Sequence, residues 1–126
     1  MSESLPLQGQ RLLLLEDEFA LAVGLADLAV DLGADVIGPV ACVADALALI
    51  EQVPELDAAI LDVNLGRETS FAVADALLAR GVPFLFATAN DRLALPERFA
   101  DVPLCRKPFG VQTFRQALCD CLGATV

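Results

Sequence analysis

Five short runs of apolar residues, separated by segments with helical spacing, constrain this chain more than any other feature. The runs stay apolar on successive residues, as "LLLL" at 12–15 and "AAIL" at 58–61 show. Strands of this kind are buried on both faces in a parallel sheet that helices cover on either side. The expected strands cover residues 12–15, 35–40, 57–63, 83–90 and 102–107, and the expected helices cover residues 19–32, 43–53, 70–80, 91–100 and 111–122. This alternation predicts an α/β fold with a five-stranded parallel sheet and helices on both faces.

Length and composition favour one compact domain. The chain has 126 residues, of which 56% are hydrophobic and 21% charged, so it can bury a core of its own. We expect a single domain over residues 1–126, with an ordered core from about residue 10 to residue 123. The formal net charge of -10 repels nucleic-acid phosphates and anionic membrane surfaces, so neither is expected as a direct partner.

Cysteine usage and the first residues favour a cytoplasmic location. The four cysteines form no C-x-x-C pair and the chain has no histidine, which removes the usual ligands of zinc and haem sites. Thiols in such apolar contexts are more often reduced core residues than disulfide partners. The opening "MSESLPLQGQR" lacks the profile of a signal peptide, and no apolar run reaches membrane-spanning length.

Polar side chains stand at the carboxyl ends of the expected strands. Glu16 and Asp17 follow the first strand, Asp62 lies at the end of the third, Thr88 lies near the end of the fourth and Lys107 ends the fifth. Open parallel sheets bind ligands outside the carboxyl ends of their strands. We therefore expect three carboxylates, one hydroxyl and one ammonium group to share one edge of the sheet.

Such an acidic group requires compensation by a cation. Two carboxylates about 5 Å apart repel by roughly 3 kcal/mol at an effective dielectric of about 20. Mg²⁺ (or Mn²⁺) suits a site that offers carboxylate, carbonyl and water oxygens and no histidine. The ion and Lys107 would neutralise a transferred phosphoryl group while Asp62 acts as the nucleophile and forms an acyl phosphate.

The segments "LLLLEDE", "AILDVNLG", "FATA" and "CRKPF" resemble, in this order, the receiver domain of two-component response regulators. The resemblance covers nearly the whole chain and implies the flavodoxin-like (βα)5 fold of that family. It implies that Asp62 is the phosphoacceptor and Asp17 a direct metal ligand. Glu16 would act through a metal-bound water, and the backbone carbonyl of Asn64 would complete the ligand set.

The same resemblance assigns the residues that read the phosphoryl group. Thr88 would hydrogen-bond to it and Lys107 would pair with it, with Ala89 as a further phosphate-binding or switch position. The Lys107–Pro108 peptide bond is expected to be cis. Asn64 and Asn90 would tune the lifetime of the acyl phosphate, or would only complete turns.

The chain departs from the family pattern in two places. Many receivers carry Tyr or Phe three residues before the lysine, as a switch residue, where this chain has Leu104; an ordinary core leucine is the simpler interpretation. Pro96 falls inside the expected fourth helix and would break it, so this helix should be short or irregular. The segments "FATA", "LPERF" and "KPF" resemble a branch of single-domain receivers with a poorly formed fourth helix. Phosphorylation is expected to order residues 89–101.

The resemblance implies a histidine kinase or histidine phosphotransfer protein as partner, docked on the first helix. Leu21, Gly24 and Leu25 are the candidate docking residues, although Leu21 and Leu25 could equally face the sheet. A downstream protein target is a further partner, and the chain would be a monomer or weak homodimer. Alternative functions are an aspartyl-phosphate phosphatase of the haloacid dehalogenase type and a non-phosphorylated pseudo-receiver that only binds partners. A nucleotide-binding domain is disfavoured because no glycine-rich turn follows the first strand.

Overall fold

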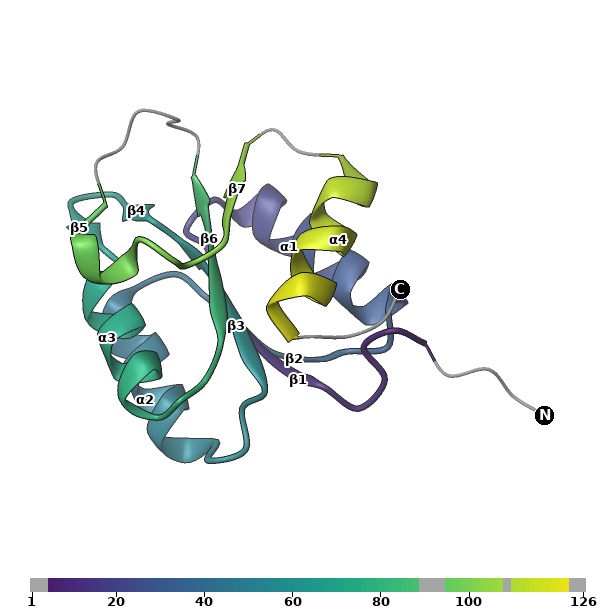
Figure 1. Cartoon of the computed structure of the whole chain (residues 1–126), viewed down its shortest axis with the longest axis horizontal. Coiled ribbons are helices and arrows are strands. Elements are labelled where there is room, and N and C mark those ends of the chain that lie inside the picture. Colours follow the sequence, from purple (N-terminus) through teal and green to yellow (C-terminus); the bar gives the residue numbers. More distant parts are fainter. Residues whose placement is uncertain (1–4, 89–94, 108–109, 123–126) are drawn as a thin grey trace.

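The computed structural model describes residues 5–88, 95–107 and 110–122, which form a five-stranded parallel sheet between two layers of helices (Figure 1). The strand order is β2-β1-β3-β6-β7, a doubly wound arrangement that confirms the predicted fold class. The strands are β1 (Arg11–Leu15), β2 (Asp35–Val40), β3 (Ala58–Asp62), β6 (Phe84–Thr88) and β7 (Leu104–Arg106). The helices are α1 (Phe19–Asp31), α2 (Val43–Gln52), α3 (Phe71–Ala79) and α4 (Val111–Leu122).

The three inner strands supply the core on both sides of the sheet. All five residues of β3 and of β6 are buried, and so are four of the five residues of β1. Leu13 and Leu15 belong to the hydrophobic cluster under α2 and α3, whereas Leu12 and Leu14 belong to the cluster under α1 and α4. Successive residues thus enter different clusters, which explains why the strand sequences are apolar throughout.

The strand register brings the carboxyl ends of the inner strands level with one another. Leu15 pairs with Leu61 across β1 and β3, and Asp62 pairs with Ala87 across β3 and β6. The next residue after β1 is therefore level with Asp62. At the other side, Thr88 pairs with Arg106 of β7. The edge of the sheet thus gathers the polar residues that the sequence predicted there.

The described part of the fourth helical segment is short, as Pro96 predicted. In the described part of the expected 91–100 helix, the structure has only the 3-10 helix η1 (Glu97–Phe99), which begins directly after Pro96. Proline lacks an N–H group and disfavours a helical conformation for the residue before it. Residues 91–94 of the expected helix lie outside the described residues. No helix in the described ranges has the length and apolar character needed to cross a membrane.

A small antiparallel hairpin follows β3 and was not predicted. It consists of β4 (Asn64–Leu65) and β5 (Glu68–Thr69), with Gly66 in the turn at a φ of 67°. The Glu68 carboxylate accepts a hydrogen bond of 3.1 Å from the backbone N–H of Val43, in the first turn of α2. Strands of two residues are too short to give a periodic signal in the sequence.

The edge strand β2 is interrupted at Gly38. Its pairing with β1 shifts by one residue between Ile37 and Val40, and Gly38 has a φ of 107°. A Cβ atom at this position would lie 2.9 Å from the Val40 nitrogen and 3.1 Å from the Leu14 oxygen. Only glycine adopts this conformation without strain. The Gly38–Pro39 peptide bond is cis, which the sequence analysis missed.

Candidate functional site

Three carboxylates meet where β1 and β3 end. Oxygen atoms of Glu16, Asp17 and Asp62 lie within 4.8 Å of one another. Glu16 and Asp62 are buried, whereas Asp17 is exposed to solvent. The structure therefore brings together the three acids that the sequence placed at the strand ends.

Lys107 enters this group from the residue after β7. Its Nζ atom lies 2.7 Å from a Glu16 oxygen and 3.4 Å from an Asp62 oxygen. Its backbone N–H donates a 2.7 Å hydrogen bond to the Thr88 carbonyl, which fixes the chain beyond the sheet edge. The second Glu16 oxygen accepts a hydrogen bond of 3.1 Å from the Glu18 N–H. Both oxygens of the buried Glu16 are thus held in place.

Burial and neighbouring charge alter the acid–base properties of the site. The pKa of Asp62 is raised from 3.8 to about 7, mainly by desolvation and then by the hydrogen bond and negative charge of Glu16, whereas Lys107 lowers it by a smaller amount. Burial alone would lower the pKa of Lys107, but its hydrogen bond to Glu16 and the charges of Asp62 and Glu16 raise it. The lysine remains a permanent cation, and Asp62 is the group whose charge depends on the surroundings.

The set of donor atoms fits a hard divalent cation. The group consists of carboxylates, one of them open to solvent at Asp17, and the chain contains no histidine. Mg²⁺ and Mn²⁺ favour oxygen ligands, and they keep coordination positions for water and phosphate oxygens. One ammonium group compensates only one of the three negative charges, so a further cation would relieve the repulsion.

Thr88 is buried at the end of β6, one register step beyond Asp62. It lies on the same face of the strand as Phe86, because alternate residues share a face. Asn64 is exposed and opens the hairpin, where it pairs with Thr69. Ala89, Asn90 and Pro108 were also predicted to act at the site, and they lie outside the described residues.

Comparisons with known proteins agree with this geometry. No protein-family model and no curated protein matched the chain. Among solved structures, it is similar to SdrG from Sphingomonas melonis Fr1, with 43% identity, a TM-score of 0.79, and coverage of 90% of this chain and 97% of that chain. The BeF3-activated conformation of SdrG from Pseudomonas melonis Fr1 also has 43% identity, with a TM-score of 0.75 and coverage of 89% of this chain and 95% of that chain. A response regulator receiver protein from Burkholderia phymatum has 23% identity, a TM-score of 0.80, and coverage of 93% and 98%.

This chain belongs to the receiver domains of response regulators. Receivers are phosphoacceptor signalling domains and not turnover enzymes. The haloacid dehalogenase alternative is therefore not supported. Receivers interact with histidine kinases or histidine phosphotransfer proteins.

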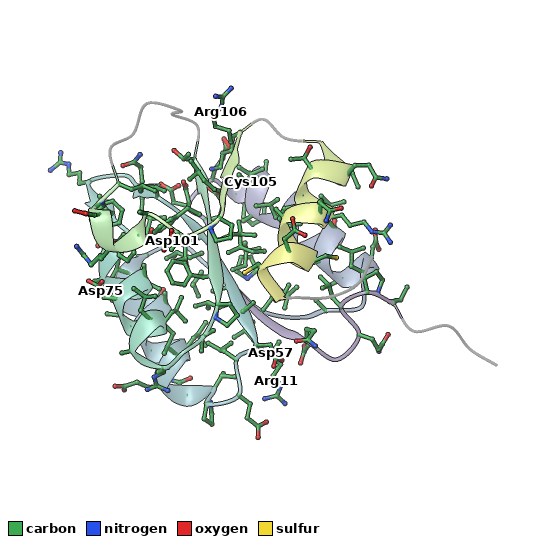
Figure 2. The ribbon with its side chains drawn as sticks, viewed as in Figure 1. Arg11, Asp57, Asp75, Asp101, Cys105 and Arg106 are labelled. Atoms are coloured by element: carbon green, nitrogen blue, oxygen red, sulfur yellow. The ribbon has the colours of Figure 1, made fainter. Side chains whose placement is uncertain are left out.

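The receiver has no core side chain at the position of the usual aromatic switch. Leu104 is 47% exposed on the edge strand β7, so the interpretation of Leu104 as a core residue was wrong. Successive side chains of a strand point to opposite faces of the sheet, so Leu104 lies on the face opposite to that of Cys105. The adjacent Cys105 points to the core instead. Figure 2 shows Arg106 projecting away from the body of the protein beyond it.

The predicted docking residues on α1 need correction. Leu25 is only 2% exposed and belongs to the core, and Leu21 is partly buried against the same cluster. Gly24 alone of the three is exposed. The exposed apolar side chains at this end of the helix are Phe19, which is 82% exposed, and Val23. In the sequence, Phe19 and Val23 are apolar residues that fall outside the stripe of α1 that faces the sheet, and this signal would have identified them as exposed.

Proposed function

We propose that this receiver accepts a phosphoryl group from a phosphohistidine partner onto Asp62, with Mg²⁺ or Mn²⁺ bound beside it. The observation that supports the proposal is the meeting of three carboxylates within 4.8 Å, with the Lys107 ammonium 3.4 Å from Asp62. We expect the domain to act in the cytoplasm.

Asp62 is the nucleophile in this proposal. One of its oxygens forms a bond to phosphorus while the bond from phosphorus to the histidine nitrogen breaks, and the electron pair stays with the imidazole. The carboxylate must be ionised to react, so conditions that lower its pKa from about 7 favour transfer. The strand β3, buried on both faces, holds the carboxylate in a fixed position.

The ion would be held by Asp62 and Asp17, by Glu16 through water and by the Asn64 carbonyl. A bound divalent ion supplies positive charge to the phosphoryl oxygens during transfer. Asp17 is exposed at the mouth of the group, where it remains accessible from solvent. The group has three carboxylates and one lysine, and this excess of negative charge supports the binding of a cation.

Lys107 and Thr88 would respond to the phosphoryl group. Lys107 would exchange part of its contact with Glu16 for a phosphoryl oxygen, and Thr88 and Ala89 would bind another. We propose that this step biases the segment that follows Thr88, and that Asn64 and Asn90 tune the lifetime of the acyl phosphate. The prediction that phosphorylation orders residues 89–101 stays part of the proposal; in the described part of that segment, Phe99 packs against Phe86, and residues 89–94 lie outside the described residues.

The phosphohistidine partner would dock on the exposed face of α1. Phe19 stands two residues after Asp17 at the start of α1, and its side chain is 82% exposed. Val23, four residues after Phe19, continues this face one turn further along the helix, and the exposed Gly24 is next to it in the sequence. Exposed apolar side chains beside a glycine suit close packing against a helix of the partner.

Intact-mass measurement tests the proposal. The protein is incubated with acetyl phosphate and Mg²⁺, beside Asp62→Asn and the control Asp45→Asn, which removes an exposed carboxylate of α2. We expect one added phosphate on the wild type and on the control, and none on Asp62→Asn. Equal uptake by Asp62→Asn would refute the assignment. No uptake by any folded form would favour the pseudo-receiver function.

A further inference from the structure

A groove lies at the opposite end of the sheet from Asp62. It encloses about 400 Å³ between the end of α3, the start of β6, the turn before β7 and the last turns of α4. Figure 1 shows α3 and α4 on opposite sides of the sheet, with the connection from η1 to β7 running between them. We call it the α3–α4 groove.

The floor and walls of the groove are apolar. Phe84 is buried beneath it, Val82 and Val102 are partly exposed, and Leu78 is 47% exposed at its wall. In the described residues, the face of the sheet under α2 and α3 is also packed by Phe99 of the three-residue helix η1. The groove lies at the lower end of this face, where these apolar side chains remain partly exposed.

The rim of the groove carries unbalanced negative charge. Arg98 lines the groove, but its guanidinium is engaged by Asp75 through two hydrogen bonds of 2.7 and 3.0 Å. Asp101 and Asp120 also line it, and both are exposed. Asp101 lies after η1 on the side facing the viewer in Figure 2. An occupant with basic residues would match this rim, whereas a second copy of a chain with net charge -10 would be repelled.

The backbone at the groove does not favour an added strand. Pro83 and Pro103 both line it, and neither has an N–H group to donate. Their carbonyls are already used, since Pro83 accepts from Ala59 at 3.1 Å and Pro103 accepts from Phe86 at 3.0 Å. Side chains must therefore make the contacts, as when an amphipathic helix lays its apolar face in a groove.

We propose that the α3–α4 groove binds an amphipathic helix of a protein partner, with apolar side chains against Leu78, Val82 and Val102 and basic residues beside Asp101 and Asp120. This surface lies apart from α1 and from Asp62. The partner could therefore bind while a phosphohistidine protein occupies the other end of the sheet. The inference does not depend on phosphorylation of Asp62.

Titration of the ¹⁵N-labelled protein tests the proposal. The probe is a 14-residue amphipathic peptide made of leucine and lysine, and the control peptide has glutamate at each lysine position. We expect the lysine peptide to shift amides near residues 78–84, 101–103 and 117–121. The glutamate peptide should bind at least tenfold more weakly.

Matched variants separate this groove from general attraction to an acidic protein. Asp101→Asn with Asp120→Asn removes two rim charges, and Asp27→Asn with Asp45→Asn removes two exposed charges elsewhere. We expect the first pair to weaken binding by about two- to tenfold and the second pair to leave it unchanged. Leu78→Ser should also weaken binding of the lysine peptide. Leu78 is 47% exposed, so this substitution removes little buried apolar surface from the core.

Three results would overturn the proposal. The first is equal weakening by both charge pairs, which would indicate attraction without a site. The second is a set of shifts concentrated on α1. The third is a dimer in sedimentation experiments that Leu78→Ser abolishes, because the groove would then be occupied by a second copy of the chain.

Discussion

The ammonium group of Lys107 lies 2.7 Å from Glu16 and 3.4 Å from Asp62. The buried Glu16, and not the proposed phosphoacceptor, is therefore the nearer partner of the lysine. Glu16 also raises the pKa of Asp62 through a hydrogen bond and through its charge. The same acid thus holds the lysine and disfavours ionisation of Asp62 until a cation enters.

Replacing Glu16 by glutamine should lower the pKa of Asp62 from its value of about 7. The substitution removes a neighbouring negative charge, and it releases Lys107 to pair with Asp62. Titration of the Asp62 side-chain carbon by NMR, in the presence of EDTA, measures the change. Asp57→Asn is unsuitable as a control because Asp57 accepts a 2.8 Å bond from the Arg11 N–H, so Asp45→Asn serves instead. An unchanged or higher pKa in Glu16→Gln would contradict the expectation.

The metal-free protein should lose stability as pH rises from about 4 to 8. The pKa of Asp62 is about 7 in the folded state and 3.8 in the unfolded state. Between these values the folded state binds more protons, so the stability that comes from this protonation falls as pH rises and is lost once pH passes 7. At about 1.4 kcal/mol per pKa unit, the loss has a ceiling of about 4 kcal/mol. Urea unfolding in EDTA at pH 5 and pH 8 measures it.

Two comparisons assign this loss to Asp62. Asp62→Asn removes the titrating group, so its stability should change less between pH 5 and pH 8 than that of the wild type. At pH 8, added Mg²⁺ should stabilise the wild type by an amount that grows with its concentration, and Asp62→Asn less. A wild-type protein that gains stability between pH 5 and pH 8 in EDTA would refute the prediction.

Ser70→Ala should leave stability unchanged or raise it by up to about 1 kcal/mol. Ser70 occupies the N-cap position of α3. Replacing a serine that caps a helix through its hydroxyl usually lowers the stability by about 1 kcal/mol. Here the hydroxyl makes no capping hydrogen bond and is fully buried without a partner. Urea unfolding compares Ser70→Ala with Ser70→Thr, whose added methyl group should destabilise the packed site. Destabilisation of Ser70→Ala by more than 1 kcal/mol would show that the hydroxyl has a partner in solution.

Phe19→Ala should slow phosphoryl transfer from a phosphorylated histidine phosphotransfer protein and leave uptake from acetyl phosphate unchanged. Phe19 is 82% exposed two residues after Asp17, so its loss removes no contact in the core, and on our proposal it removes a contact with the protein donor. Val30→Ala is the matched control, because Val30 is also exposed on α1 but lies three turns away. A fall in both reactions would indicate damage to the site and not loss of docking.

Asp75→Asn should increase amide exchange in η1. The Arg98 guanidinium binds the Asp75 carboxylate through two hydrogen bonds and stacks 4.5 Å from the centre of the Phe99 ring. The hydrogen bonds from Arg98 hold the pKa of Asp75 below its usual value. The stability that this ion pair contributes is therefore present at neutral pH, and it is lost as pH falls through the pKa of Asp75 in the folded state. Exchange of the 97–100 amides at pH 7 measures the effect, and Arg98→Lys should act in the same direction. The change in global stability should be small, because both side chains are half exposed.

The sequence predicted the strands and the acidic group well because both depend on strong, local signals. The continuous apolar runs located β1, β3 and β6 within two residues of their observed ends, and the acids directly after them share the sheet edge by register. The exposure of Leu104 was not predictable in this way, since it depends on which face of β7 other elements cover. Leu25 was assigned to docking because a helical stripe does not by itself say which apolar residues the sheet covers.

The interruption of β2 has a consequence for how molecules of this protein meet one another. β2 forms one margin of the sheet, and within it Gly38 shifts the pairing while Pro39 offers no N–H group. A foreign strand aligned there would find neither a straight ladder nor a complete row of donors. Sheet-to-sheet polymerisation through β2 is thereby disfavoured, so the irregular backbone at Gly38 also protects an exposed edge of this hydrophobic chain from pairing with another copy.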